Sequence, residues 1–481
     1  MHNAIVGGLF AALLTAATSA AASPWLDVGD NQIRGDLALL AASGVIDDVT
    51  TQWPLPAASL IAELAGAPPR GMPKAVAADR LLRRLGQSDE PLTAGITLDA
   101  TNSPATVYGF DSLGREKGQA QFTLDYDGAT TWGRLALGAI TADYTGRGTK
   151  WMLDGSYLAQ KAGPLVIYGG YLSHWWGPGW ISALSLSNNA RPMPQIGLTR
   201  SSSAASDWPV LRWLGPWQVE FFLGYLDGPR VQKHTYYNAL HFTFNPAPGL
   251  EIGLSRTEQF CGQSHPCVPL RDYFDLANDP THINRTNDQG TFEIKYGHAL
   301  WGTPAEIYLQ VMNEDSSPFT HSGSSHLFGG SLFLPSASGP LRLTAEYTDS
   351  VATADIFSFG DVFHGFAYNN GTYVDGMRYR GRSLGFSLDS DSRLFSLQAA
   401  WSDSRDWFYQ LSLHHAVVSN PHNALGNVAT AAPFIANIAE LRLGLPLGGF
   451  RLDLAGRIAD DQPRPGKGAD AAIEARLHFN L

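Results

Sequence analysis

The sequence contains little cysteine, a modest share of charged residues and no long apolar segment beyond its first residues. Its 481 residues include 2 cysteines, and the 33 Lys and Arg residues are outnumbered by 44 Asp and Glu residues. The resulting net charge of -11 argues against nucleic acid as a partner. After residue 22 no apolar run could cross a bilayer as a helix, so membrane residence would require a closed barrel or a surface anchor.

The first residues have the character of an export leader. The stretch Ala4 to Ala17 is almost wholly apolar but short for a membrane span, and it leads into the small residues Thr18 to Ala22. Met1 to Asn3 lack the positive charge that usually begins a signal peptide. We expect residues 1–22 to be a signal peptide that is removed before Ser23.

The two cysteines lie close together in the segment Cys261-Gly-Gln-Ser-His-Pro-Cys267. In an exported chain, a small disulfide within a loop is the first interpretation. A zinc site that includes His265 is the weaker alternative, because zinc needs three or four ligands and no second cluster is evident. We expect no metal and no other cofactor.

From about Gly95 onward, apolar and polar residues alternate, as in Leu341 to Thr348 and Phe450 to Ile458. The charges on alternate positions require a wet interior if the apolar face meets lipid. The last segment, Ala471 to Leu481, alternates to its end, as expected of a strand that closes a barrel, although its terminal residue is not aromatic. We predict an all-β transmembrane barrel of about 18 antiparallel strands over residues 93–481.

Before the barrel, residues 23–92 show a helical apolar period. The first of three short helices should begin after Asp30 and end near Gly44, and the second should run from Pro56 to Gly66. The third should begin at Pro73 and end at Gly86. This small bundle should pack on the rim or mouth of the barrel at the periplasmic side, and a loosely tethered helical hairpin is the alternative.

Turn lengths indicate which end of the barrel faces outward. The tight turn Pro446 to Gly449 suits the periplasmic side, whereas the long segments 258–288, 349–382 and 419–433 suit the outside. Counting strands back from Leu481 does not place all three long segments at one end. The strand assignment between residues 349 and 406 therefore contains an error.

Two segments resemble the Wzi family of capsule assembly proteins: residues 172–180, LSHWWGPGW, and residues 186–194, LSNNARPMP. The segment PWLDVGD at residues 24–30 resembles the start of mature family members, and the likeness extends over nearly the whole mature chain. The resemblance implies an outer-membrane barrel with a periplasmic helical bundle, acting as a non-catalytic surface lectin for exported capsular polysaccharide. The resemblance transfers no sugar-binding residue. We expect polysaccharide and outer-membrane lipid as partners, and the sequence leaves open whether the barrel acts alone or beside the capsule export machinery.

Two groups of residues are candidates for contact with a polysaccharide. The first combines indole faces, on which sugar rings can stack, with amide and guanidinium groups that can bond hydroxyls and acidic sugars: Trp175, Trp176, Trp180, Asn188, Asn189 and Arg191. Packing at the bilayer interface or in the lumen is the alternative for the tryptophans. The second group could contact a ligand or fold inward to close the barrel: Phe357, Phe359, Phe363, His364, Phe366, Tyr368, Asn369 and Asn370.

A solute channel and a hydrolase are the alternative functions. A solute channel would use the charges at lumen positions, which are Arg342, Glu346, Arg451, Asp453, Glu474 and Arg476. A hydrolase could use Ser419 with His414, but a nucleophile also needs an orienting group and an oxyanion hole, and no nucleophile-elbow or zinc motif appears. We expect no enzymatic activity.

Overall fold

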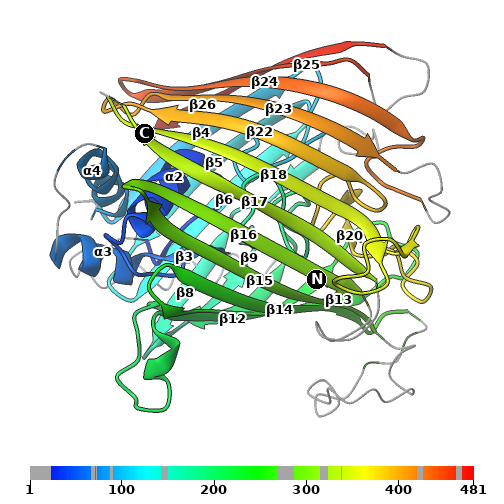
Figure 1. Ribbon diagram of the computed structural model, residues 1–481, viewed down its shortest axis with the longest axis horizontal. Coiled ribbons are helices and arrows are strands. Elements are labelled where there is room, and N and C mark those ends of the chain that lie inside the picture. The colour runs from blue at the N-terminus through cyan, green and yellow to red at the C-terminus, as the bar shows by residue number, and fades with distance from the viewer. Residues whose placement is uncertain are drawn as a thin grey trace.

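Eighteen antiparallel strands close into a barrel, as predicted (Figure 1). The computed structural model describes residues 23–66, 71, 73–86, 90–141, 150–263, 265, 267, 286–314, 323–336, 338–419, 426–461 and 468–481. The expected signal peptide, residues 1–22, lies outside the described residues.

The wall strands follow one another around the barrel in chain order. They are β4 (Leu92–Thr101), β5 (Gly118–Asp127), β6 (Thr131–Ile140), β8 (Tyr157–Ala162), β9 (Leu165–Gly170), β11 (Gln195–Arg200), β12 (Trp217–Leu226), β13 (Thr235–Ala247), β14 (Leu250–Phe260), β15 (Asn287–Leu300), β16 (Thr303–Glu314), β17 (Ser324–Pro335), β18 (Pro340–Thr353), β22 (Arg393–Ser402), β23 (Phe408–Val418), β24 (Phe434–Leu447), β25 (Phe450–Ala459) and β26 (Asp470–Asn480). Two short strands extend the sheet beside the ends of longer ones: β7 (Lys150–Met152) pairs with the last residues of β6, and β19 (Val362–Phe363) pairs with the last residues of β18. The last strand pairs with the first, with Leu477 opposite Leu98, so the C-terminal segment closes the barrel.

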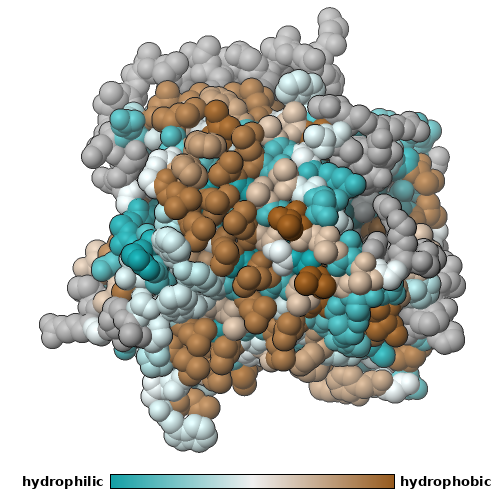
Figure 2. All heavy atoms as spheres, turned by 90° about the horizontal axis from the view of Figure 1, so that it is seen from above, coloured by the Kyte–Doolittle hydropathy of each residue, from teal (hydrophilic) through white to brown (hydrophobic). Residues whose placement is uncertain are grey.

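Side chains on each strand alternate between the outer wall and the lumen. On β24, Ile435 and Leu441 are 58% and 52% exposed on the outer wall, whereas Arg442 is buried inside. Figure 2 shows hydrophobic side chains spread across the outer wall. This alternation suits a barrel with lipid outside and polar groups inside.

The segments 258–288, 349–382 and 419–433 all connect strands at one end of the barrel. The strand count from the sequence, which did not place all three at one end, was therefore wrong between residues 349 and 406. Residues 354–392 contribute no wall strand. They contain three two-residue strands: β19, which pairs with β18, and β20 (Arg378–Tyr379) and β21 (Arg382–Ser383), which pair with each other. In Figure 1, β20 lies at the end of the barrel opposite α3 and α4. The Pro446 to Gly449 turn joins β24 and β25 at the end that carries the helices.

The three expected helices are present as α2 (Asn31–Ala42), α3 (Ala57–Gly66) and α4 (Lys74–Leu85). Asp30 caps α2, because its Oδ1 accepts the amide protons of Gln32 and Ile33 at 3.0 Å each. Gly44, with φ +67°, lies two residues beyond the end of α2. Within the described residues, no helix has the length and apolar character required to cross a membrane.

Helix α2 packs against α4 and against the inner surface of β15, β16 and β18, so it lies inside the mouth of the barrel. Arg80 of α4 fastens the pair to the turn between β22 and β23. Its Nη1 binds Asp36 of α2 at 2.9 Å, its Nε binds Asp406 at 2.9 Å, and its Nη2 donates to the carbonyl of Asp403 at 2.7 Å. Arg80 and Asp36 therefore form a buried ion pair between the two helices, and Arg80 also links them to the barrel through Asp406 and the Asp403 carbonyl.

Candidate functional site

Residues 171–194, which connect β9 to β11, fold into the lumen and are called the plug loop here. Within it, β10 (Trp175–Trp176) pairs with β2 (Gln52–Trp53) of the N-terminal segment, and Trp175 lies opposite Trp53. The plug loop enters from the end opposite the helices. A segment from each end of the barrel thus contributes one strand to a small sheet in the lumen.

Trp180 is the best-held side chain of the plug loop. Glu346 of β18 accepts its backbone N–H at 2.7 Å, and Glu306 of β16 accepts its indole N–H at 2.8 Å. The guanidinium carbons of Arg34 and Arg342 lie 4.5 and 3.2 Å from the centre of the indole. Charges from α2 and from two wall strands therefore fix this indole between them.

The two glycines of the Trp-Gly-Pro-Gly turn are required by its close packing. Gly177 has φ +140°, and a Cβ there would lie 2.5 Å from Nε2 of Gln310. A Cβ on Gly179 would lie 2.2 Å from the carbonyl oxygen of Ser182. The two glycines therefore allow the backbone of the turn to approach Gln310 of the wall and the Ser182 carbonyl of the plug loop.

Residues 364–392, called the cap here, cover the plug loop at the end opposite the helices. The Tyr368 hydroxyl donates to the Leu184 carbonyl at 2.6 Å, and Ser187 Oγ donates to the Gly385 carbonyl at 2.6 Å. These contacts join the cap and the plug loop into one packed unit across the lumen.

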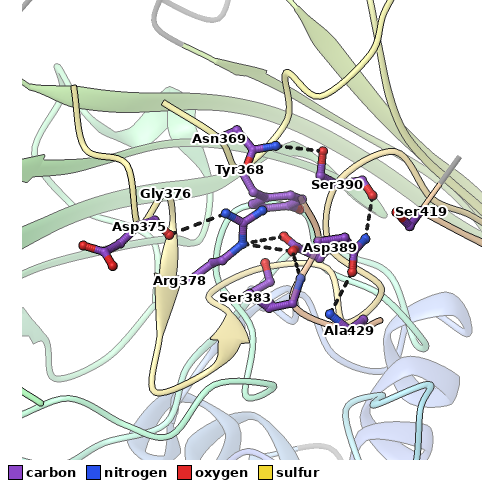
Figure 3. Close-up of polar contacts among 12 residues, drawn as sticks. Tyr368, Asn369, Asp375, Gly376, Arg378, Ser383, Asp389, Ser390, Ser419 and Ala429 are labelled. Carbon is purple, nitrogen blue, oxygen red and sulfur yellow. Dashed lines mark hydrogen bonds and ion pairs between the residues drawn. The ribbon is translucent and has the colours of Figure 1, made fainter. Parts of the chain in front are cut away.

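An ion pair holds the cap together (Figure 3). Arg378 Nε lies 2.9 Å from an oxygen of Asp389, and the two side chains are 9% and 0% exposed. Asn369 Nδ2 donates to Ser390 Oγ at 3.1 Å in the same cluster. The backbone N–H of Val428 donates to Asp389 at 2.7 Å, which ties the cap to the connection between β23 and β24.

The structure separates the six predicted sugar-binding residues into two places, both buried. Trp175, Trp176 and Trp180 are 0%, 0% and 2% exposed in the lumen, as the packing alternative anticipated. Asn188, Asn189 and Arg191 are 6%, 2% and 7% exposed beneath the cap. The three polar residues border a cluster of arginines. Asn188 connects this cluster to the indoles, because its Nδ2 donates at 2.8 Å to the carbonyl of Phe110, whose ring packs against Trp175.

This cluster combines three arginines at the junction of the plug loop and the cap. Arg115 Nη2 donates to the Asn188 carbonyl at 2.5 Å, Arg382 Nη1 donates to Asn189 Oδ1 at 3.1 Å, and Arg191 Nη1 lies 3.0 Å from Asp154. Burial lowers the pKa of the Arg382 guanidinium, and the neighbouring arginines lower it further. Sequence reasoning missed Arg115 and Arg382, because both are distant in sequence from the residues that they contact.

A cavity of about 680 Å³ lies beneath this cluster, and it extends to the helix end of the lumen. It is lined by the N-terminal segment and by charged residues of the wall, among them Asp125, Arg134, Arg451, Asp453 and Arg476. Most of these charges have protein partners, as in the pairs Arg451 with Asp453 at 3.0 Å and Arg134 with Asp125 at 2.5 Å.

The other lumen charges named from the sequence also contact protein groups, and Arg342 does so through Gln398 and the Trp180 ring. Arg342 and Glu346 hold the plug loop at Trp180, as described above. Glu474 lies 2.8 Å from Arg457, and Arg476 lies 2.9 Å from Asp99. Arg342 and Glu346 therefore contact the plug loop, whereas Arg451, Asp453, Glu474 and Arg476 make ion pairs within the barrel wall.

The aromatic group at residues 357–370 is divided between the surface and the interior. Phe357, Phe359 and Phe363 are 84%, 65% and 47% exposed at the outer end of the barrel. Tyr368 and Asn369 are 0% and 9% exposed within the cap. Tyr368 and Asn369 thus fold inward, whereas ligand contact by the exposed phenylalanines stays a prediction.

The candidate hydrolase pair has other partners. His414 Nδ1 lies 2.8 Å from Ser396 Oγ, and the backbone N–H of Ser419 donates to Ser392 Oγ. Cys261 and Cys267 form a disulfide. In the part of the chain that the structure describes, no group of three or more His, Cys, Asp or Glu residues is placed to hold a metal ion.

Comparisons with known proteins extend these observations. The family model for "Capsule assembly protein Wzi" matches residues 87–449. A Klebsiella pneumoniae protein, described as an uncharacterized 55.8 kDa protein in the cps region, is 28% identical over 326 residues, which span 66% of this chain and 64% of that protein. The match therefore covers less than two thirds of that relative's length.

Among solved structures, the chain is similar to the Escherichia coli outer-membrane protein Wzi, which is described as involved in group 1 capsule assembly and as a carbohydrate-binding β-barrel. The two align with a TM-score of 0.82 at 22% identity, over 95% of this chain and 99% of that one. The fold is thus shared over nearly the full length of both chains.

Proposed function

The chain belongs to the Wzi family of capsule assembly proteins, and we propose that it binds exported polysaccharide and retains it on the cell surface. It is an outer-membrane β-barrel. The proposed ligand is capsular or extracellular polysaccharide, the class that the Escherichia coli relative's carbohydrate binding suggests. The capsule export machinery is a further proposed partner.

The obstruction of the lumen by the plug loop and the cap is the observation that carries this proposal. The plug loop and the cap lie one behind the other across the bore, and the hydrogen bonds from Tyr368 to Leu184 and from Ser187 to Gly385 join them. A channel for solutes would need a continuous open path instead. This arrangement favours a protein that works at its outer surface over one that passes its ligand through the barrel.

We place the polysaccharide contact at the outer edge of the loop before the cap. Phe357, Phe359 and Phe363 expose their rings there, and aromatic faces can stack against the C–H faces of sugars. Each contact would be weak, but a polymer that meets many barrels gains affinity through multivalency. The six residues first suggested by the sequence would support this surface from below by holding the plug loop and the cap.

A complementation experiment tests the proposal. Cells lacking the gene would be supplied with the wild-type protein, with the Phe357→Ala, Phe359→Ala, Phe363→Ala variant, or with the Val231→Ala control, whose side chain is 74% exposed on another outer connection. We expect the triple variant to shift polysaccharide from the cell-bound to the released fraction and the control to behave like wild type. Binding of the purified proteins to the host's own polysaccharide should follow the same order.

Two results would count against the proposal. If deletion of the gene left cell-bound and total polysaccharide unchanged, surface retention would not be the function. If the triple variant bound polysaccharide as well as the control, the contact surface would lie elsewhere. Heat-dependent mobility on gels would establish that each variant forms the folded barrel.

We also propose that the protein acts without catalysis. The contact between His414 and Ser396 gives the imidazole a hydroxyl partner other than Ser419. Chemical change in the bound polysaccharide that was lost in His414→Ala or Ser419→Ala would contradict this proposal.

A further inference from the structure

The connection between β11 and β12, residues 201–216, exposes an unusual number of large apolar side chains. Trp208, Val210 and Trp213 are 59%, 58% and 62% exposed. The connection lies at the end of the barrel that carries α3 and α4, and Figure 1 shows it extending sideways from the wall at β12. A patch of this kind on an ordered turn indicates a binding surface.

The turn has a defined conformation. The backbone N–H groups of Leu211 and Arg212 donate to the Trp208 carbonyl at 2.9 and 3.0 Å and lead into the 3-10 helix η1 (Arg212–Leu214). Leu214 is 5% exposed and anchors the turn. Gly215 follows with φ +65°, and a Cβ there would lie 1.9 Å from the Asn245 carbonyl oxygen. The exposed side chains are therefore presented by a fixed scaffold.

The patch is continuous with the lipid-facing wall. The ring of Trp213 lies 6.0 Å from that of Phe244 on β13. The neighbours of Phe244 point into the lumen, because Thr243 donates to Gln52 and Asn245 donates to the Asp48 carbonyl. Since side chains alternate along a strand, Phe244 faces outward, toward lipid.

Charge at the patch suits the surface of a bilayer. The guanidinium of Arg200 lies 3.7 Å from the centre of the Trp217 ring, and Arg212 is exposed between Val210 and Trp213. Tryptophans are enriched at the level of the lipid headgroups, and arginines there extend their charge toward water and phosphate.

We propose that residues 208–214 are embedded in the headgroup region of the periplasmic leaflet and bind phospholipid. Trp208, Val210 and Trp213 would face the upper acyl chains, and Arg212 would meet lipid phosphates. The turn would fix the depth and rotation of the barrel in the membrane on this side. Recognition of polysaccharide at the opposite end plays no part in this role.

The test places a fluorescent probe on the turn. In Val210→Cys the new thiol is the only free one, because Cys261 and Cys267 form a disulfide. Matched controls are Leu441→Cys on the outer wall, 52% exposed, and Arg405→Cys in the β22–β23 turn at the same end, with its side chain 73% exposed. Each labelled, full-length protein would be reconstituted in phosphatidylethanolamine and phosphatidylglycerol vesicles.

Brominated acyl chains and aqueous iodide would then be compared as quenchers. We expect the label at residue 210 to be quenched by brominated lipid to the same fraction as the label at residue 441, and to be shielded from iodide. Quenching like that of the label at residue 405 would overturn the proposal and indicate a surface left in water for a protein partner. If Val210→Cys did not fold, Pro209→Cys, which is also exposed, would carry the same test.

Discussion

Replacing Arg80 with methionine tests how the helices are attached to the barrel. Arg80 is 2% exposed, and its guanidinium binds Asp36, Asp406 and the carbonyl of Asp403 at once. The Arg80→Met side chain would retain apolar volume but remove every one of these polar contacts. Asp36, itself 1% exposed, would be left as a buried carboxylate without its cation.

The structure indicates a large effect. Removing one partner of a buried ion pair costs about 3–5 kcal/mol, because the remaining charge is uncompensated. Arg83→Ala is the matched control, since Arg83 also binds Asp406, at 3.0 Å, but with 56% of its side chain exposed. An exposed pair of this type contributes about 0–1 kcal/mol.

Hydrogen exchange measures the difference. The free energy of local opening of α4 should fall by about 3–5 kcal/mol in Arg80→Met and by less than about 1 kcal/mol in Arg83→Ala. Adding Asp36→Leu to Arg80→Met should recover much of the loss, because replacing both partners by apolar groups is often neutral. Equal losses in Arg80→Met and Arg83→Ala would refute the assignment of Arg80 as the principal attachment.

Two further predictions concern pH and the plug loop. Desolvation raises the pKa of Asp406, but the hydrogen bond from Arg80 and the charges of Arg83 and Arg80 outweigh it, so the pKa lies below its ordinary value of 3.8. The contribution of Asp406 to helix attachment is thus present above pH 3.8 and is lost as the pH falls through the folded-state pKa, and this loss should lower the free energy of local opening of α4 in that range, as measured by hydrogen exchange. Gly179→Ala should displace the plug loop and raise single-channel conductance, because the new Cβ would lie 2.2 Å from the Ser182 carbonyl oxygen. Gly449→Ala is the control and should leave conductance unchanged, because no atom lies within 4 Å of the position of its Cβ. Equal conductance in the two glycine variants would contradict this role of the turn.

The elements that the sequence predicted well depend on local signals. Asp30 provides a side-chain cap, and Gly44 and Gly86 follow the last turns of α2 and α4, so the ends of these helices could be recognised from a few neighbouring residues. The wall strands follow from alternation alone, because lipid and lumen select opposite residue types on successive positions.

The sequence predicted packing of the helices on the rim or mouth of the barrel, but it did not predict that the polar face of α2 would be buried there. A polar helix face usually indicates solvent, yet Asn31 is 4% exposed and donates to Gln410 of β23 at 2.8 Å. The polar face of α2 is thus buried against a polar lumen. Only the three-dimensional closure of the barrel brings these two residues together.

The role of the tryptophan turn was ambiguous for a related reason. An interfacial girdle, a sugar platform and a lumen plug all use tryptophan and glycine. The deciding contacts come from Glu306 and Glu346, which lie on strands more distant in the chain. Alternation had indicated a lumen position for Glu346 but not its partner. A sequence pattern identifies the residues available for such contacts but not the pairs that form.

The pairing of Trp53 with Trp175 makes assembly of the lumen depend on two segments that enter from opposite ends of the barrel. One strand of this joint comes from the N-terminal segment at the helix end, and the other comes from the plug loop at the opposite end. The small sheet can therefore form only when both segments have entered the lumen.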